Sequence, residues 1–337
     1  MLPFSEIKIF PGSGGRKFAE RMCDYLEVEM GKSEVITFTE GNIYVKCEET
    51  VRDKDVYLIQ PIGLNPNKEF TEILFWLDAF QRASVHSVTA VIPYFGYAQG
   101  DKKDEPRVSI RGRVCAESIE QAGAGRVVTM DLHSAQIQGF FKKPVDHLFA
   151  RPILCEYFRH TLELDNTVVV SPDAGFAKEV IQYAEYLQLP VAIGDKKRRG
   201  HKEDASLLEI IGEVEGKDVI IFDDFAISGG TLVNLAEELR KRGAKEIHAG
   251  LSHLLLSEEG VDRIENSCLN SLVGTDTVYN PAVAGSSRIK EVSVAPLFAE
   301  IISRIHRRES VTPLFEQVPE KVLNCSVKMG GIADEEL

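Results

Sequence analysis

Short apolar runs alternate with amphipathic stretches along most of the chain. Runs such as 88–92 and 219–222 are short and rich in Ile and Val, which is typical of buried strands. In the stretch 67–82, apolar residues instead recur three or four positions apart, which predicts a helix with one apolar face. The same criteria predict strands at 7–10, 34–38, 42–46, 55–60, 126–130, 167–170, 190–193, 247–251 and near 272, and helices at 18–26, 114–122, 153–162, 176–187, 231–242 and 295–306.

Two rounds of this alternation follow one another, and each predicts an α/β domain with a mainly parallel sheet and helices on both faces. Matching strand-then-acid endings, Met130-Asp131 and Phe222-Asp223, indicate that the two halves are similar. The predicted domains cover 1–150, with an exposed polar excursion at 99–111, and 151–305. Residues 306–337 are predicted to form a C-terminal segment and tail, because the sequence after Phe315 lacks periodicity.

Composition and charge narrow the functional classes. Hydrophobic residues make up 44% of the 337 positions, but no apolar run approaches the length of a membrane helix. The formal net charge of −13 argues against broad binding of nucleic acid or of a membrane surface. The six cysteines are scattered without a Cys-x-x-Cys pair, and the start of the chain does not resemble a secretory signal. We therefore expect reduced thiols and a cytoplasmic location.

The stretch 217–234 carries the clearest chemistry. An apolar run leads to Asp223 and Asp224, and Ser-Gly-Gly-Thr at 228–231 then opens a helix. Glycines let the backbone approach a ligand, and the free amides at a helix start face an anion. The two carboxylates can accept hydrogen bonds from sugar hydroxyls or hold a hydrated divalent metal. The segment therefore predicts a binding site for a ribose phosphate.

Other polar residues follow predicted strands, among them His133, Asp173 and a basic loop at 195–200. Ligands gather at the carboxyl ends of parallel strands, so His133 and Asp173 are candidates to share a divalent metal. The alternative for a single histidine is a structural role. Lys196 and Arg198 occupy alternate positions, and an extended loop would present both to one side. There they can stabilise the charge that spreads during phosphoryl-type transfer.

A second glycine-rich stretch, 12–17, lacks the spacing of a nucleotide-binding loop. It contains neither Gly-x-x-x-x-Gly-Lys-Ser/Thr nor Gly-x-Gly-x-x-Gly. We interpret it as a tight turn with at most a secondary role towards anions.

Eight stretches, taken together, resemble a known family. They are EETVRDKDVYLIQ, RASVHSVTAVIPYFGYA, VTMDLHSAQIQGFF, VVVSPD, DKKRR, IIGEVEGKDVIIFDD, SGGT and VAPLFAEIISRIHRRESVTPLF. Their order is similar to that in the ribose-phosphate diphosphokinase family, also called ribose-phosphate pyrophosphokinase or phosphoribosyl pyrophosphate synthetase. The segment YFGYA with its following Asp-Lys-Lys run, and the segment MDLHSAQIQGFF, are highly specific to that family.

The resemblance implies two tandem type I phosphoribosyltransferase-like domains. It also implies transfer of the diphosphate of ATP to the anomeric hydroxyl of ribose 5-phosphate, with Mg²⁺, to give phosphoribosyl pyrophosphate and AMP. In the family, the ATP contacts come partly from a neighbouring subunit within dimers that assemble into hexamers. The resemblance therefore predicts a homo-oligomer.

Individual roles follow from the same resemblance. Lys196 and Arg198 would be catalytic, and His133 and Asp173 would be linked to the metal. The residues implied in binding ribose 5-phosphate are Asp223, Asp224, Ile227, Ser228, Gly229, Gly230 and Thr231, and those implied in binding ATP are Phe38, Glu40, Asn42, Gln99, Gly100 and Asp101.

The chain departs from the family pattern mainly at the expected ATP site. Where the family has Phe-Ser-Asp-Gly-Glu, this chain has Phe-Thr-Glu-Gly-Asn at 38–42. The usual Arg-Gln after Tyr-Ala is Gln99-Gly100, which removes a guanidinium that could hold phosphate or stack on a base. In the ribose-phosphate loop, Ile227 replaces an Asp and Ser228 replaces a Thr. The acid pair, His133 and Asp173 are unchanged.

Three functional hypotheses remain at this point. The first is an active diphosphokinase with altered donor affinity, donor choice or regulation. The second is a weakly active or non-catalytic paralogue that regulates a true synthetase, although the retained Lys196 and Arg198 argue against it. The third is a phosphoribosyltransferase that consumes the product, which the duplicated half and the YFGYA segment disfavour.

Overall fold

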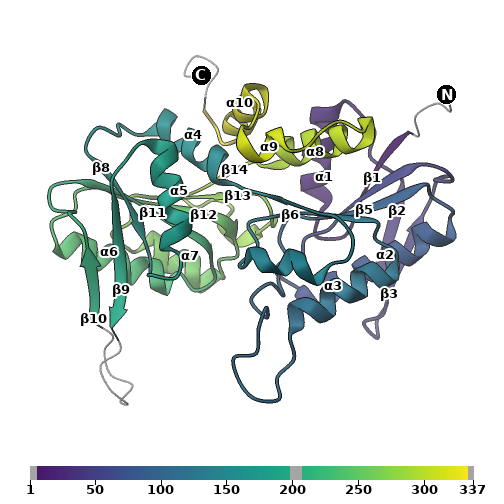
Figure 1. The fold of residues 1–337 in the computed structure, drawn as a ribbon, viewed down its shortest axis with the longest axis horizontal. Coiled ribbons are helices and arrows are strands. Elements are labelled where there is room, and N and C mark those ends of the chain that lie inside the picture. The colour runs from purple at the N-terminus through teal and green to yellow at the C-terminus, as the bar shows by residue number, and fades with distance from the viewer. Residues whose placement is uncertain (1–5, 198–206, 333–337) are drawn as a thin grey trace. The chain divides into compact units, whose positions relative to one another are not determined.

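The computed structural model describes residues 6–197 and 207–332 (Figure 1). The chain divides into two compact units, each built around its own sheet. Unit 1 consists of Met1–Phe149, Thr277–Tyr279 and Val294–Val322, and unit 2 consists of Ala150–Asp276, Asn280–Ser293 and Leu323–Leu337.

The sheet of unit 1 has five parallel strands. Their order is β1 (Ile7–Pro11), β4 (Asp55–Ile59), β5 (Ser87–Ile92), β6 (Arg126–Met130) and β7 (Val145–Leu148). The unit also contains α1 (Arg16–Leu26), α2 (Pro66–Arg82), α3 (Arg111–Ala122), the 3-10 helix η1 (Ala135–Phe140), α8 (Ala295–Arg307) and α9 (Pro313–Glu316).

Helices cover both faces of this sheet because successive strand residues point to opposite sides. On one face, the Phe10 ring lies 6.4 Å from Trp76 and 5.0 Å from Phe80 of α2, measured between ring centroids. On the other face, the Tyr57 hydroxyl donates a hydrogen bond to the Ile302 carbonyl of α8 at 3.4 Å. The predicted arrangement of a parallel sheet between helices is confirmed.

Helix α8 belongs to unit 1, although residues up to 305 were expected in the second domain. It packs against α1, where the rings of Phe298 and Phe18 meet edge to face with centroids 5.2 Å apart. This contact joins positions 280 residues apart in sequence, which periodicity along the chain cannot reveal. The division of the second domain therefore differs from the expected limits of 151–305.

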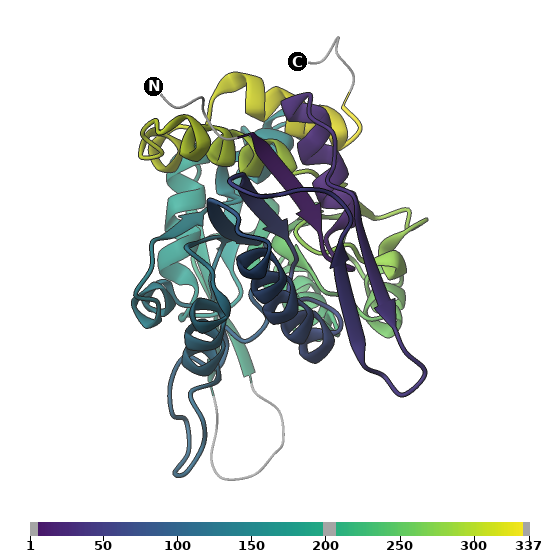
Figure 2. The same cartoon turned by 90° about the vertical axis from the view of Figure 1, so that its right-hand side faces the viewer.

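A two-stranded hairpin stands apart from the main sheet of unit 1. Strands β2 (Ser33–Thr37) and β3 (Ile43–Cys47) pair antiparallel, as Figure 2 shows in purple. The polar excursion 99–111 contains neither helix nor strand before α3 begins at Arg111. It was expected to be an exposed excursion or a small hairpin, and most of its residues are exposed without strand pairing.

The sheet of unit 2 has seven strands, all parallel except β10 at one edge. Their order is β10 (Leu207–Ile211), β9 (Val191–Lys197), β8 (Thr167–Ser171), β11 (Asp218–Ala226), β12 (Ile247–Leu254), β13 (Ser271–Thr275) and β14 (Ile289–Val292). The helices are α4 (Arg151–Thr161), α5 (Ala177–Leu187), α6 (Gly230–Lys241), α7 (Glu258–Glu265), the 3-10 helix η2 (Pro281–Val283) and most of α10 (Glu320–Met329).

Residues of β11 show how the two faces of this sheet are buried. Phe222 stacks on Tyr183 of α5 at 4.1 Å and meets Phe158 of α4 edge to face at 5.6 Å, between centroids. Its neighbour Ile221 points to the opposite face and joins a core that includes Leu235 of α6. The strand is thus buried on both sides, which explains its continuous apolar run.

Two strands of unit 2 extend further than predicted. The predicted loop 195–200 begins as strand, because β9 continues to Lys197 and pairs antiparallel with β10. Likewise β11 continues through Asp223 and Asp224 to Ala226, because pairing with β12 persists as far as Ala226 and Leu254. Both extensions contain polar side chains, so the sequence does not show them as apolar runs. Backbone pairing does not depend on side-chain polarity.

The segment after Phe315 is also more ordered than predicted. It was expected to lack regular structure, but it forms α10, in which Val322 and Val327 are almost fully buried. Helix α7 and strands β7, β10 and β14 were not predicted either. These elements have between four and eight residues, which is too short for a clear periodicity in the sequence.

Candidate functional site

The turn between β11 and α6 holds the predicted ribose-phosphate loop, 227–231. Gly229 precedes α6 with a φ of 66°, a left-handed conformation that glycine adopts without steric cost. Helix α6 then begins at Gly230, so its first amides lack intrahelical carbonyl partners. Ile227, Ser228 and Thr231 are exposed beside these amides. The loop can therefore present backbone donors to an anion, and the helix dipole adds to the attraction.

Helix α7 and its N-cap residue donate hydrogen bonds to carbonyl groups of this loop. The Ser257 amide donates to the Ile227 carbonyl at 2.9 Å, and Arg263 Nη1 donates to the Ser228 carbonyl at 2.8 Å. A Cβ atom at Gly260 would lie only 2.5 Å from the Ile227 carbonyl oxygen, so the approach of α7 requires glycine there. The conformation of the loop is thus fixed by a neighbouring helix as well as by its own glycines.

The paired acids lie at the carboxyl end of the same strand. Burial raises the pKa of Asp223 well above its usual value, and the negative charges of Asp224 and Asp173 add to this effect. The Asp223 carboxylate accepts a hydrogen bond from the Asp224 amide at 3.0 Å, and Asp173 accepts one from the Phe176 amide at 3.0 Å. Two neighbouring carboxylates therefore disfavour the charged form of Asp223, and a cation would relieve that repulsion.

These donors suit a hydrated Mg²⁺ better than a metal enclosed by protein ligands. Among residues 6–197 and 207–332, no three His, Cys, Asp or Glu side chains are grouped closely enough to form a metal cage. Mg²⁺ usually keeps several waters and binds through one or two carboxylates together with substrate phosphates. Asp173 belongs to unit 2 and His133 to unit 1.

The predicted catalytic cations lie at the limit of the described chain. Lys196 lies in β9, where its backbone is in register with Leu208 of β10. Arg198 lies outside the described residues. The structure therefore describes the backbone of the strand that carries Lys196, and the predicted catalytic roles of both residues stay predictions.

The first group of predicted ATP-binding residues forms the turn between β2 and β3. The Phe38 amide donates to the Asn42 carbonyl at 2.8 Å, and Asn42 Nδ2 donates to the Glu40 carboxylate at 3.3 Å. The rings of Phe38 and Tyr44 lie 6.4 Å apart, and nearly half of each side chain is exposed. The turn therefore presents an exposed aromatic surface, which can stack on a planar base.

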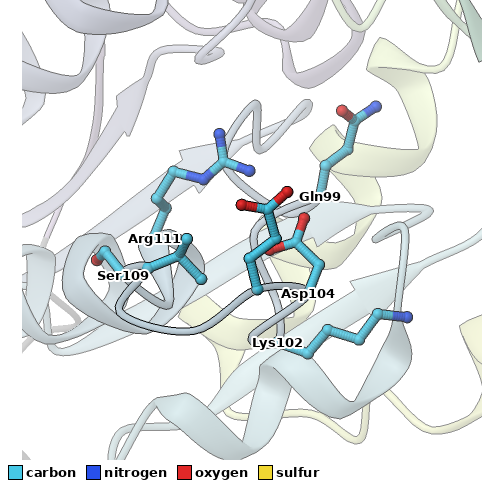
Figure 3. Close-up of a pocket in the computed structure, with 7 residues that line it drawn as sticks. Gln99, Lys102, Asp104, Ser109 and Arg111 are labelled. Carbon is cyan, nitrogen blue, oxygen red and sulfur yellow. The ribbon is translucent and has the colours of Figure 1, made fainter.

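The second group, Gln99, Gly100 and Asp101, begins the excursion before α3. A hollow of about 490 Å³ opens there (Figure 3). Its lining residues are Gln99, Lys102, Asp104, Glu105, Val108, Ser109 and Arg111. The structure thus brings Gln99 together with the cations Lys102 and Arg111, of which only Gln99 was singled out from the sequence as a ligand-binding residue.

In the glycine-rich turn at 12–17, hydrogen-bond donors are bonded to other side chains of the protein. Both the amide and the hydroxyl of Ser13 donate to the Glu72 carboxylate, at 2.7 and 2.5 Å. The Gly14 amide donates to the Gln60 side chain at 3.0 Å. The interpretation as a tight turn is confirmed, and an internal carboxylate of α2 takes up donors that an external anion would need.

Ser257, Arg263 and Arg111 are the residues near the predicted sites that sequence reasoning missed. A signal existed for the first two, because Ser257 followed by two glutamates is a typical helix start. Indeed Ser257 caps α7 by accepting a hydrogen bond from the Gly260 amide at 3.1 Å. No local signal relates α7 to the loop at 227–231, or Arg111 to Gly100, since these contacts are tertiary.

Parallel sheets covered by helices, with an acid pair and a glycine turn at a strand end, define the chain as an α/β protein suited to a phosphorylated sugar. Sequence models of the N-terminal domain of ribose phosphate pyrophosphokinase and of the phosphoribosyl synthetase-associated domain match residues 7–123 and 199–316. The chain is 42% identical over 311 residues to ribose-phosphate pyrophosphokinase 2 of Enterococcus faecalis, covering 92% of this chain and 96% of that protein. It therefore belongs to the ribose-phosphate pyrophosphokinase family.

Two further relatives agree along nearly the whole length. The ribose-phosphate pyrophosphokinase of Fusobacterium nucleatum is 39% identical over 316 residues, covering 94% of this chain and all of that protein. The crystal structure of phosphoribosylpyrophosphate synthetase from Mycobacterium smegmatis superimposes with a TM-score of 0.84 at 31% identity, covering 90% of this chain and all of that one. The resemblance found in the sequence is thus confirmed in sequence and in fold.

Proposed function

We propose that the protein transfers the diphosphate of ATP to the anomeric hydroxyl of ribose 5-phosphate, forming phosphoribosyl pyrophosphate and AMP. The observation that carries this proposal is the β11–α6 turn, where two acids precede a loop of helix-start amides. A ribose phosphate has a diol at one end and a phosphate at the other, and the turn offers acceptors and donors in the same order. Family membership along the chain supports the same reaction.

In this proposal, the sugar phosphate binds along the turn. Asp223 and Asp224 interact with the ribose hydroxyls, directly or through hydrated metal, and 227–231 surrounds the 5-phosphate. The replacement of Asp by Ile at 227 leaves the backbone of the loop in place, since its carbonyl is bonded to the Ser257 amide. The main departure within this loop therefore removes a carboxylate without removing phosphate donors.

Mg²⁺ is proposed as the cofactor because crowded carboxylates of unit 2 favour a cation. His133 and Asp173 would be linked to it, and the bound ion would neutralise phosphate charge in the transition state. Lys196 and Arg198 would add positive charge where the transferring group becomes most negative. Transfer of this kind depends on placement and electrostatics more than on covalent help from the protein.

ATP is proposed to bind with its base near Phe38 and with polar contacts from Glu40, Asn42, Gln99, Gly100 and Asp101. The exposed Phe38 ring supports the first part of this assignment. The family resemblance further suggests a dimer-based homo-oligomer, a hexamer in its full form. The scattered cysteines suit a cytoplasmic location. In the part of the chain that the structure describes, no helix has both the length and the hydropathy needed to cross a bilayer.

The decisive test is AMP release from ATP and Mg²⁺ in the presence and absence of ribose 5-phosphate. AMP formed only with the sugar phosphate would support diphosphate transfer, and omission of Mg²⁺ should abolish it. A panel of other nucleoside triphosphates would then show the donor preference. If no donor yields AMP, the reaction is wrong for this chain and a regulatory paralogue becomes the better hypothesis.

A further inference from the structure

Arg111 lies directly over Gly100, where the chain departs from its family. A Cβ atom built on Gly100 would lie 2.8 Å from both Cβ and Nε of Arg111. Real Cβ atoms do not approach other atoms so closely, so any larger residue at 100 would displace this arginine. The Gly112 amide also donates to the Gly100 carbonyl at 3.0 Å, which joins the first turn of α3 to the excursion. Gly100 and Arg111 therefore form one packing unit.

The Arg111 side chain lines the hollow together with Gln99 and Lys102 (Figure 3). Within the described part of the chain, no carboxylate lies within ion-pair distance of its guanidinium. Its neighbour on the same helix, Arg113, is instead paired with Glu117 at 2.8 Å. One arginine at the start of α3 thus forms an ion pair within its own helix, whereas Arg111 lines the hollow without a salt bridge to another described residue.

The family resemblance implies an arginine at the position of Gln99, and this chain has none there. We propose that Arg111 supplies the missing guanidinium and binds the polyphosphate of the donor nucleotide in this hollow. The planar guanidinium carries five N–H donors and forms paired hydrogen bonds with phosphate oxygens, which an amide such as Gln99 cannot reproduce. The exchange at Gln99-Gly100 therefore relocates the cation, because the glycine makes room for a side chain that enters from α3.

The other groups that line the hollow agree with this assignment. Lys102 adds a second cation, and Ser109 adds a hydroxyl. Asp104 and Glu105 also line it, and they give the hollow acceptors as well as donors. Such a mixture fits a triphosphate that enters with its divalent cation better than a bare anion, since the carboxylates would repel the latter. This inference rests on the proposed function for the identity of the nucleotide.

The test compares Arg111→Gln with Arg113→Gln, a matched control that removes a charge two residues away on the same helix. Calorimetric titration with ATP and Mg²⁺ gives Kd, and steady-state assays give KM for each substrate. We expect Arg111→Gln to raise Kd and KM for ATP about tenfold or more, as loss of a charge-assisted hydrogen bond predicts. KM for ribose 5-phosphate should stay within about twofold, and Arg113→Gln should change neither constant beyond that range.

A rescue experiment separates binding from structural support. In the Arg111→Gln background, Gln99→Arg returns a guanidinium to the same hollow and should recover much of the affinity for ATP. Arg111→Lys keeps the positive charge but loses the planar guanidinium. Its affinity for ATP should lie between those of the wild type and Arg111→Gln. Melting curves identify any variant that is unfolded.

Two results would overturn the inference: an unchanged Kd for ATP in folded Arg111→Gln, or equal losses for both substrates without rescue by Gln99→Arg. Direct titration keeps this test separate from the proposed function. A wild-type protein that binds ATP through Arg111 but releases no AMP would contradict the proposed reaction alone.

Discussion

At the scale of single residues, Glu265 shows how one carboxylate organises a loop. It accepts hydrogen bonds from the Ser286 hydroxyl, from the amide and hydroxyl of Ser287, and from the Arg288 amide. The Ser286 hydroxyl is the main cause that lowers the pKa of Glu265 to about 2, followed by the Ser287 hydroxyl. Glu265 ends α7, the helix that supports the ribose-phosphate loop, so it links that helix to the loop before β14.

Replacement of Glu265 by Gln should lower the melting temperature at pH 7. The pKa of this carboxyl is depressed in the folded state, so its contribution is complete above the unfolded pKa of about 4.5. The contribution disappears as pH falls from there through about 2, and the difference between wild type and variant should shrink in that window. Melting curves at pH 7, 5 and 3 measure this. The exposed Glu237→Gln is the control, and a difference independent of pH would contradict the prediction.

Arg263 is a second residue whose importance depends on tertiary contact. Its guanidinium donates to the Ser228 carbonyl, and its Nη1 lies 3.1 Å from the position of a Cβ on Gly230. It therefore holds the loop backbone and brings a positive charge beside the helix-start amides.

Arg263→Gln should raise Kd for ribose 5-phosphate by about tenfold, because a charge-assisted hydrogen bond to the loop is lost. Binding of ATP should be unaffected, which titration with each ligand can measure. Lys241→Gln removes a charge from the far end of α6 and serves as the control. If both variants bind ribose 5-phosphate as wild type does, Arg263 has no role in this site.

At the scale of elements, strand β9 carries Lys196, an expected catalytic cation, and pairs with β10. The antiparallel ladder aligns Lys196 with Leu208 and continues to Lys197 opposite Leu207. Regular pairing restricts the backbone at Lys196 more than a free loop would, which is how a scaffold places a charge for a transition state. Strand pairing thus extends to Lys196, one of the two residues assigned to catalysis.

Lys196→Ala should lower kcat by about 100-fold or more while KM for ribose 5-phosphate changes little. The reason is that a cation aimed at the transferring group acts mainly on the transition state. Steady-state kinetics with both substrates measure the two effects separately. The exposed Lys245→Ala, at the amino end of β12, is the control. Equal losses in kcat and in ribose 5-phosphate affinity would contradict this role for Lys196.

At the scale of the whole molecule, the two expected ATP-binding segments both belong to unit 1, whereas the ribose-phosphate loop belongs to unit 2. The β2–β3 hairpin forms its own small sheet (Figure 2). The rings of Phe38 and Tyr44 in this hairpin are exposed. Exposed aromatic residues are common where a protein meets a ligand or another subunit. The hairpin is therefore a candidate for contact with ATP or with another subunit.

We expect sedimentation equilibrium to give a multiple of the 37.5 kDa chain mass, with the hexamer as the largest regular species. The expectation follows from the family resemblance, in which neighbouring subunits share the ATP site. Activity should fall on dilution if dissociation separates that site, and the loss should parallel the loss of mass. A fully active monomer would contradict shared ATP sites.

Much of the fold follows from local pattern. Apolar runs such as 88–92 and 219–222 became buried strands, and the spacing in 67–82 became α2, because burial selects residues by period. The short helices α7 and α10 were not predicted. Their stability comes from contacts with distant segments, which no window of sequence contains.

The sequence by itself determined the alternation of strands and helices, the family, and the acid pair followed by a glycine turn, since each depends on neighbours in the chain. Only the tertiary structure decided that α8 packs with α1, that Arg263 holds the loop at Ser228, and that Arg111 lies over Gly100. These contacts join residues between 11 and 280 positions apart. They arise from close packing of side chains between elements, which is a property of three-dimensional distance and leaves no period in the sequence.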